Sequence, residues 1–128
     1  LATQKYKCRF FLATGKNIEE QKILLEILSS SYKDKCYALD NLSLNEILPI
    51  IKNCNISICN DSSFSHLSSS VGVETIVLMS DTPLLYGNYS PRMHPIIPDG
   101  ENTVTHDTLG KDRINPNKIF DQLDHILS

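Results

Sequence analysis

Residues 55–72 read NISICNDSSFSHLSSSVG, and they pass from a short strand-like run into a helical pattern. Residues 55–59 alternate polar and apolar side chains, as a strand does. Residues 62–70 then predict a short helix that ends at Gly72, because glycine permits the left-handed backbone of a helix end. A strand followed directly by a helix is one unit of a parallel α/β fold.

The same alternation of short apolar runs and helical patterns continues along the chain. We expect further strands at residues 8–13, 36–39, 75–79 and 95–97. Helices are expected after Gly15, from Ser43 to about residue 53, and over residues 115–127. Right-handed crossovers predict a doubly wound parallel sheet of order 2-1-3-4-5, with helices on both faces. Ligands bind beyond the carboxyl ends of such strands, which places the expected crevice between the Gly15 and Asp61 loops.

Length and composition indicate one domain of ordinary globular type. The chain has 128 residues, a formal net charge of -3 and a pI near 5.7, without a basic stripe of interleaved aromatic residues. We therefore expect no nucleic-acid partner. No apolar run reaches the ~20 residues of a transmembrane helix and no signal-peptide pattern is found, so we expect a cytoplasmic protein. The four cysteines include no C-x-x-C pair and are expected to be reduced thiols.

The chemically distinctive side chains gather in the loop between the strand and the helix. These are Asp61, Ser62, Ser63, Ser65 and His66. A helix N-terminus presents unpaired N–H groups and a partial positive charge, so a phosphate can bind there with serine hydroxyls as further donors. Alternatively, Asp61 or Ser62 only caps the helix and the other serines face solvent. The local pattern leaves both interpretations open.

His66 also has two interpretations: its ring hydrogen-bonds a ligand oxygen, or it contacts a neighbouring loop as a structural residue. A hydrolase triad of Ser, His and Asp is not expected, because triad residues come from separate elements and the chain has no G-x-S-x-G motif. The other histidines are scattered, with no H-x-x-x-H pair and no carboxylate cluster. We therefore expect no metal site.

Four segments together resemble one known family. They are residues 42–46 (LSLNE), 56–67 (ISICNDSSFSHL), 75–83 (TIVLMSDTP) and 86–91 (YGNYSP). In order and spacing they are similar to glycosyltransferase family 9, the ADP-heptose lipopolysaccharide heptosyltransferases. The hallmark of that family is an Asp-Ser/Thr-Gly-x-x-His-Leu stretch. The resemblance covers most of the chain.

The resemblance implies a GT-B architecture of two Rossmann-like halves, in which the C-terminal half holds the donor. On this interpretation residues 1–128 are a single nucleotide-sugar-binding domain, the C-terminal half without its first strand. Its partners would be a nucleotide sugar and the missing N-terminal, acceptor-binding half. The donor would be an ADP-sugar, with no other cofactor. No transmembrane segment is expected in this chain, and the intact enzyme would associate peripherally with the inner face of the bacterial inner membrane.

The resemblance also implies roles for individual residues. Those expected around the donor diphosphate and sugar are Asp61, Ser62, Ser63 and His66. Glu19 matches an acidic position that contacts the donor ribose, and Leu42 falls where a residue lines the adenine pocket. No catalytic residue is expected in this chain, because the general base would come from the acceptor half.

One residue of the hallmark departs from the family: Ser63 stands where the family has glycine, and its side chain lies where backbone would approach phosphate. The lysine that the family brings from a preceding strand is also not in this sequence. Two other functions therefore stay open. One is a non-catalytic nucleotide- or phosphate-binding module, and the other is a flavodoxin-like or receiver-type regulatory domain. The second is disfavoured because residues 13–16 (ATGK) supply no acid after the first strand.

Two later segments have simpler interpretations. Residues 81–83 (DTP) fit a turn better than a contact to the donor sugar. Residues 98–102 predict a tight turn, and the polar residues 103–113 predict a mobile loop rather than a site.

Overall fold

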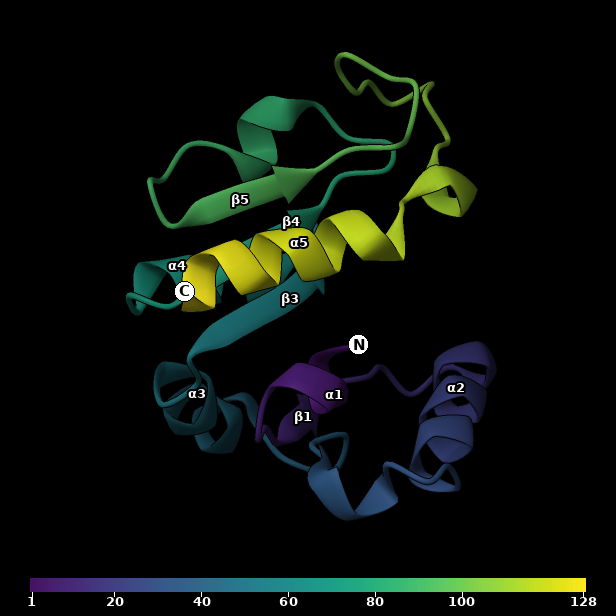
Figure 1. Cartoon of the computed structure of the whole chain (residues 1–128), viewed down its shortest axis with the longest axis vertical. Helices are drawn as coiled ribbons and strands as arrows, with labels where there is room; N and C mark the ends of the chain where they lie inside the picture. The colour runs from purple at the N-terminus through teal and green to yellow at the C-terminus, as the bar shows by residue number, and fades with distance from the viewer. The chain divides into compact units, whose positions relative to one another are not determined.

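Strands and helices alternate along the chain in a computed structural model that describes residues 1–128 (Figure 1). All three strand pairings are parallel. The fold is therefore of the expected parallel α/β class, in keeping with a Rossmann-like half of a GT-B enzyme. The chain divides into two units, Leu1–Ile47 and Leu48–Ser128.

The first unit is built on two short parallel strands joined through a helix. Its elements are α1 (Ala2–Lys5), β1 (Phe10–Leu12), α2 (Ile18–Leu28), η1 (Lys33–Lys35) and β2 (Cys36–Ala38), and α3 (Leu44–Lys52) continues into the second unit. The side chain of Asn17 caps α2 by accepting from the N–H of Glu20 over 2.8 Å. The face of α2 that carries Leu24 is buried. The sequence did not predict α1.

The second unit contains a parallel sheet of three strands in the order β3-β4-β5. Its elements are β3 (Ile56–Asn60), α4 (Ser63–Ser70), β4 (Glu74–Leu78), η2 (Leu84–Gly87), β5 (Met93–Ile96), η3 (Lys111–Arg113) and α5 (Pro116–Leu127). Asn60 pairs with Leu78, and Leu78 pairs with Ile96, so the three strands end level with one another.

The central strand β4 supplies most of the core of this unit. Its β-branched residues Thr75, Ile76 and Val77 are completely buried. Val77 packs in a cluster with Met79, Met93 and Val104, against which Leu84 and Ile97 also lie. A strand covered on both faces needs apolar residues at successive positions, which explains the run TIVLM at residues 75–79.

Helix α4 packs closely on the sheet through small side chains. Ser65 and Ser68 are fully buried, and the Ser68 hydroxyl donates to that of Ser57 in β3 over 3.0 Å. This bond satisfies a polar group that burial would otherwise leave unpaired. Gly72 follows the helix with φ of 87°, a conformation that glycine adopts without steric cost.

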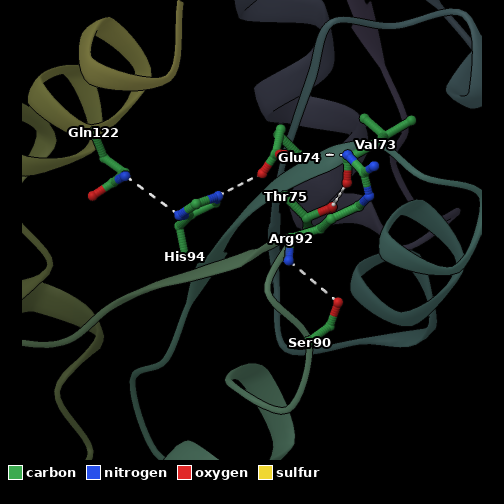
Figure 2. A network of polar contacts seen from close by, with 7 residues as sticks. All are labelled: Val73, Glu74, Thr75, Ser90, Arg92, His94 and Gln122. Carbon is green, nitrogen blue, oxygen red and sulfur yellow. Dashed lines mark hydrogen bonds and ion pairs between the residues drawn. The ribbon is translucent and has the colours of Figure 1, made fainter.

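A polar network ties α5 to the sheet (Figure 2). Glu74, the first residue of β4, accepts from Arg92 over 3.2 Å and lies 2.6 Å from Nε2 of His94 in β5. The other ring nitrogen of His94 is 3.4 Å from Nε2 of Gln122 in α5. Ligands of parallel sheets bind beyond the carboxyl ends of strands. Because Glu74 begins its strand, this network lies at the opposite end of the sheet from the edge where ligands bind.

The predicted strands and helices all form, within a few residues of the expected ends. The strand neighbours 2-1, 3-4 and 4-5 are confirmed. The adjacency of β1 and β3 would join the two units and stays a prediction. None of the helices combines the length and the apolar character needed to cross a bilayer.

Candidate functional site

A polar pocket of about 190 Å³ opens where β3 and β4 end. Its lining residues are Asn60, Asp61, Leu78, Ser80, Asp81, Thr82 and Lys111. Six of these seven are polar, and Asn60 and Leu78 are the last residues of their strands. The pocket therefore lies at the edge of the sheet where parallel α/β proteins bind their ligands.

Asp61 is the most enclosed carboxylate of the predicted site. Its side chain is 15% exposed, and its Oδ1 lies 3.8 Å from Nε2 of His66, one turn into α4. The sharp change from strand to helix at residues 61 and 62 brings these two side chains to the same end of the sheet. A carboxylate in this position can accept hydrogen bonds from a ligand and from the histidine.

His66 contacts a neighbouring loop through its other ring nitrogen. Nδ1 lies against the hydroxyl of Tyr89, and the two rings stack with centroids 5.5 Å apart and planes inclined by 11°. The structural interpretation of His66 is confirmed to this extent. Its side chain is nevertheless 45% exposed, so one face of the imidazole stays accessible.

The start of α4 shows which serine caps the helix. Ser62 is the N-cap residue and forms a capping box with Ser65. The Ser65 hydroxyl donates to the carbonyl oxygen of Ser62 over 2.7 Å and accepts from its N–H over 3.4 Å. Capping is thus confirmed, whereas Ser65 is wrong as a phosphate donor because it is fully buried and bonded within the loop.

The remaining donors at this helix end are free. Ser63 is exposed at the first helical position, and the N–H groups of Ser63 and Phe64 make no hydrogen bond. These N–H groups carry the positive end of the helix dipole. The capping of α4 therefore leaves room for an anion at the same helix end.

The Asp81-Thr82-Pro83 segment is both a turn and a wall of the pocket. Asp81 accepts from the Ser80 hydroxyl over 3.2 Å, and Pro83 precedes η2. The hydroxyl oxygen of Thr82 is buried and makes no hydrogen bond. The turn interpretation holds, and Asp81 and Thr82 also line the pocket.

The predicted nucleoside-binding residues belong to the first unit. Glu19 lies exposed in the first turn of α2, and Leu42 is partly exposed after β2. The adjacent Glu20 is engaged in the loop, where its carboxylate contacts the N–H of Gly15 and accepts from Asn17 over 2.8 Å. Of the two neighbouring glutamates, Glu19 is therefore the one available to a ligand.

Cys59, the residue before the end of β3, is a poor nucleophile. Burial raises the pKa of its thiol to about 11, and the nearby Asp61 carboxylate adds to the rise while a hydrogen bond from Ser57 opposes it. All four cysteines are free thiols. At neutral pH the Cys59 thiol is therefore protonated and weakly reactive, because the thiolate is the reactive form.

Several residues of the site were not predicted, among them Tyr89 and Lys111. Tyr89 lies in the aromatic segment 86–91 that carries part of the family resemblance, so its contact with His66 had a weak signal in the sequence. Lys111 had none, because it follows a polar stretch without periodicity. No group of three or more His, Cys, Asp or Glu side chains is gathered as metal ligands would be.

Comparison with known families gives one match. The profile of glycosyltransferase family 9 (heptosyltransferase) matches residues 1–109, which include Asp61, His66 and Tyr89. No curated protein and no solved structure matches the chain. The match spans well over half of the 128 residues and agrees with the parallel α/β fold. The chain therefore belongs to glycosyltransferase family 9 and forms a glycosyltransferase domain.

Proposed function

We propose that this chain is the donor-binding, C-terminal half of a GT-B heptosyltransferase, with residues 1–128 acting as one nucleotide-sugar-binding domain. The observation that carries the proposal is the arrangement around Asp61. A polar pocket and the free N–H groups of a helix start both lie beside this residue, within the segment that matches the family. Nucleotide sugars combine a polyhydroxyl group with a diphosphate. The polar pocket suits the polyhydroxyl group, and the free N–H groups of the helix start suit the diphosphate.

The diphosphate would bind at the start of α4. The free N–H groups of Ser63 and Phe64 would donate to it, together with the hydroxyls of Ser62 and Ser63 and the imidazole of His66. Negative charge grows on the diphosphate as the glycosidic bond breaks. Fixed donors at this position would stabilise that charge more in the transition state than in the ground state.

Asp61 would accept hydrogen bonds from the sugar, because its carboxylate lines the pocket. The pocket volume of about 190 Å³ is below the usual range for whole ligands, about 300–1,000 Å³, and suits one part of a nucleotide sugar. Glu19 and Leu42 are proposed as contacts to the ribose and the adenine, on the family resemblance alone.

The donor, the acceptor and the general base of the proposed reaction are taken from the family resemblance. The donor would be ADP-heptose and the acceptor a lipopolysaccharide core, reached at the inner face of the inner membrane. The acceptor-binding half would supply the base that deprotonates the acceptor hydroxyl. This chain by itself would bind the donor without transferring the sugar.

A second function, a nucleotide-binding module without activity, is favoured by Ser63. This residue adds a side chain at the position where the family's glycine lets backbone approach phosphate. The two functions differ in whether an added acceptor half restores sugar transfer from ADP-heptose.

Calorimetric titration with ADP and ADP-heptose, against UDP and GDP, tests the proposal. We expect selective binding of the adenine nucleotides, weakened about tenfold by His66→Ala and severalfold by Ser62→Ala, the range expected for loss of one hydrogen bond to a charged group. His106→Ala is the matched control, because His106 is exposed outside the pocket. Absence of nucleotide binding at millimolar concentration, or equal losses in the control, would contradict the proposal.

A further inference from the structure

Residues 98–113 return from β5 to the end of β4 and are fixed there by a backbone hydrogen bond. The N–H of Gly110 donates to the carbonyl oxygen of Ser80 over 2.9 Å. Val104, in the middle of the segment, is 2% exposed and belongs to the core cluster. The segment predicted as a loop without a site is thus anchored beside the pocket.

Gly110 lets the backbone lie closer to Pro98 and to the carbonyl oxygen of Ser80 than a residue with a side chain would allow. A Cβ at this position would lie 2.2 Å from Cγ of Pro98 and 3.2 Å from the carbonyl oxygen of Ser80. The preceding Leu109 has φ of 45°, in the left-handed region that leucine disfavours, although its side chain is 76% exposed. Core packing does not explain this strained backbone. The left-handed turn at Leu109 leads into Gly110, and Lys111, the residue after that glycine, lines the pocket.

A second anchor follows Lys111. The guanidinium of Arg113 donates to the carbonyl oxygen of Asp99 over 3.1 Å and to Glu101 over 2.9 Å. The N–H of Asp99 donates in return to the carbonyl oxygen of Arg113 over 2.9 Å. Lys111 therefore lies between two fixed points of the backbone.

The ammonium group of Lys111 is free to bind a ligand. It lines the pocket with Asp61 and Asp81 but makes no ion pair or hydrogen bond with either. The buried hydroxyl of Thr82 also lacks a partner. Donors and acceptors therefore both line a space of about 190 Å³. A polyhydroxyl group can accept from the donors and donate to the acceptors of the pocket. A phosphate in the same place would face two carboxylates.

We propose that Lys111 is a sugar-binding residue that selects the glycosyl group of the donor. Its ammonium donates to sugar hydroxyls whose own hydrogens are accepted by Asp61 and Asp81. This inference rests on the proposed donor site. Lys111 lies outside the matched residues 1–109.

The test compares ADP-heptose with ADP, using calorimetry on the wild-type chain and on Lys111→Met, which keeps most of the aliphatic stem. We expect Lys111→Met to weaken ADP-heptose binding about tenfold, the loss typical of one hydrogen bond to a charged group, and to leave ADP binding within about twofold. Lys111→Arg should retain most of the affinity. Lys52→Met is the control, since Lys52 is exposed at the end of α3 and does not line the pocket.

Each alternative outcome is distinct. Equal loss of ADP and ADP-heptose binding in Lys111→Met would place Lys111 on the phosphates and overturn the inference, as would no loss at all. Wild-type binding of ADP without added affinity for ADP-heptose would also overturn it, while leaving a nucleotide site in place. If the wild-type chain binds neither compound, the proposed function fails, and this inference fails with it.

Discussion

The phenol ring of Tyr89 stacks on the imidazole of His66, with centroids 5.5 Å apart, and its hydroxyl contacts Nδ1. Nε2 of the same imidazole points to Asp61, 3.8 Å away. These contacts agree with one arrangement of protons, in which the tyrosine hydroxyl donates to Nδ1 and the hydrogen of the ring lies on Nε2, facing the carboxylate. These contacts fix the orientation of the His66 ring and leave its side chain 45% exposed.

Tyr89→Phe should remove the hydroxyl that favours the Nε2–H tautomer of His66, while keeping the stacked ring in place. We expect the Nε2–H tautomer of neutral His66 to lose its dominance and the free energy of unfolding to fall by about 0.5–1.5 kcal/mol, as for one hydrogen bond. Nitrogen-15 NMR of the imidazole and urea unfolding measure the two effects. Tyr86→Phe is the control, because Tyr86 is exposed and its hydroxyl has no partner. Unchanged imidazole shifts in Tyr89→Phe would refute the assignment.

Ser63→Gly should tighten ADP binding severalfold. The substitution removes a side chain beside the free N–H groups at the start of α4, so that backbone can approach a phosphate more closely. Ser70→Gly changes the other end of the same helix, where the serine is also exposed, and should leave ADP affinity unaltered. Calorimetry compares both with the wild type. Weaker ADP binding by Ser63→Gly would show that the lost Ser63 hydroxyl matters more for phosphate binding than the closer approach of the backbone.

Ile76 and Ile58 are paired in register on adjacent strands but differ in burial, at 0% and 46% exposed. Ile76→Ala should lower the free energy of unfolding by about 2–5 kcal/mol, because it leaves a cavity in the core. Ile58→Ala should cost less than half as much, since water already reaches that side chain. Urea unfolding monitored by circular dichroism gives both values. Similar losses for the two variants would mean that β4 is not the centre of the core.

Cys59 should resist alkylation at neutral pH and should make the fold less stable in alkali. Its folded-state pKa of about 11 exceeds the ordinary value of 9.0, so the unfolded chain loses its proton first as pH rises. Stability from this thiol is complete below pH 9 and declines as pH rises toward 11. Iodoacetamide labelling followed by mass spectrometry should show Cys59 reacting slowly when folded and at the ordinary rate in urea. Rapid labelling of folded Cys59 at pH 7 would contradict its half-buried, protonated state.

Asp99 should contribute stability that acid removes. Hydrogen bonds from Lys118 and Asn115 hold its pKa below the ordinary value of 3.8. A lowered carboxyl pKa stabilises the fold above the ordinary value, and this contribution disappears as pH falls through the folded-state pKa. Asp99→Asn should therefore be less stable than the wild type at pH 7, and the difference should vanish in strong acid. Asp107→Asn, which changes an exposed carboxylate, should show no such pH-dependent difference.

The sequence by itself determined the local features of this protein. The strand, turn and helix of residues 55–72, a helix cap at Asp61 or Ser62 and the hallmark Asp61 and His66 all follow from side chains within a few positions of one another. Helix caps, alternation and helical periodicity act over that short range, so they can be predicted without a structure. The buried strand β4 was predicted for the same reason, from five successive apolar or β-branched residues.

Only the tertiary structure decided which distant residues complete the site. Tyr89 reaches His66 across 23 positions of sequence, and Lys111 reaches the pocket through the Gly110 to Ser80 hydrogen bond. The path of each connecting loop sets these contacts, and that path depends on the core that Val104 helps to fill. Local pattern carries no information on such a path, because the free energy that fixes it comes from packing between segments far apart in the chain.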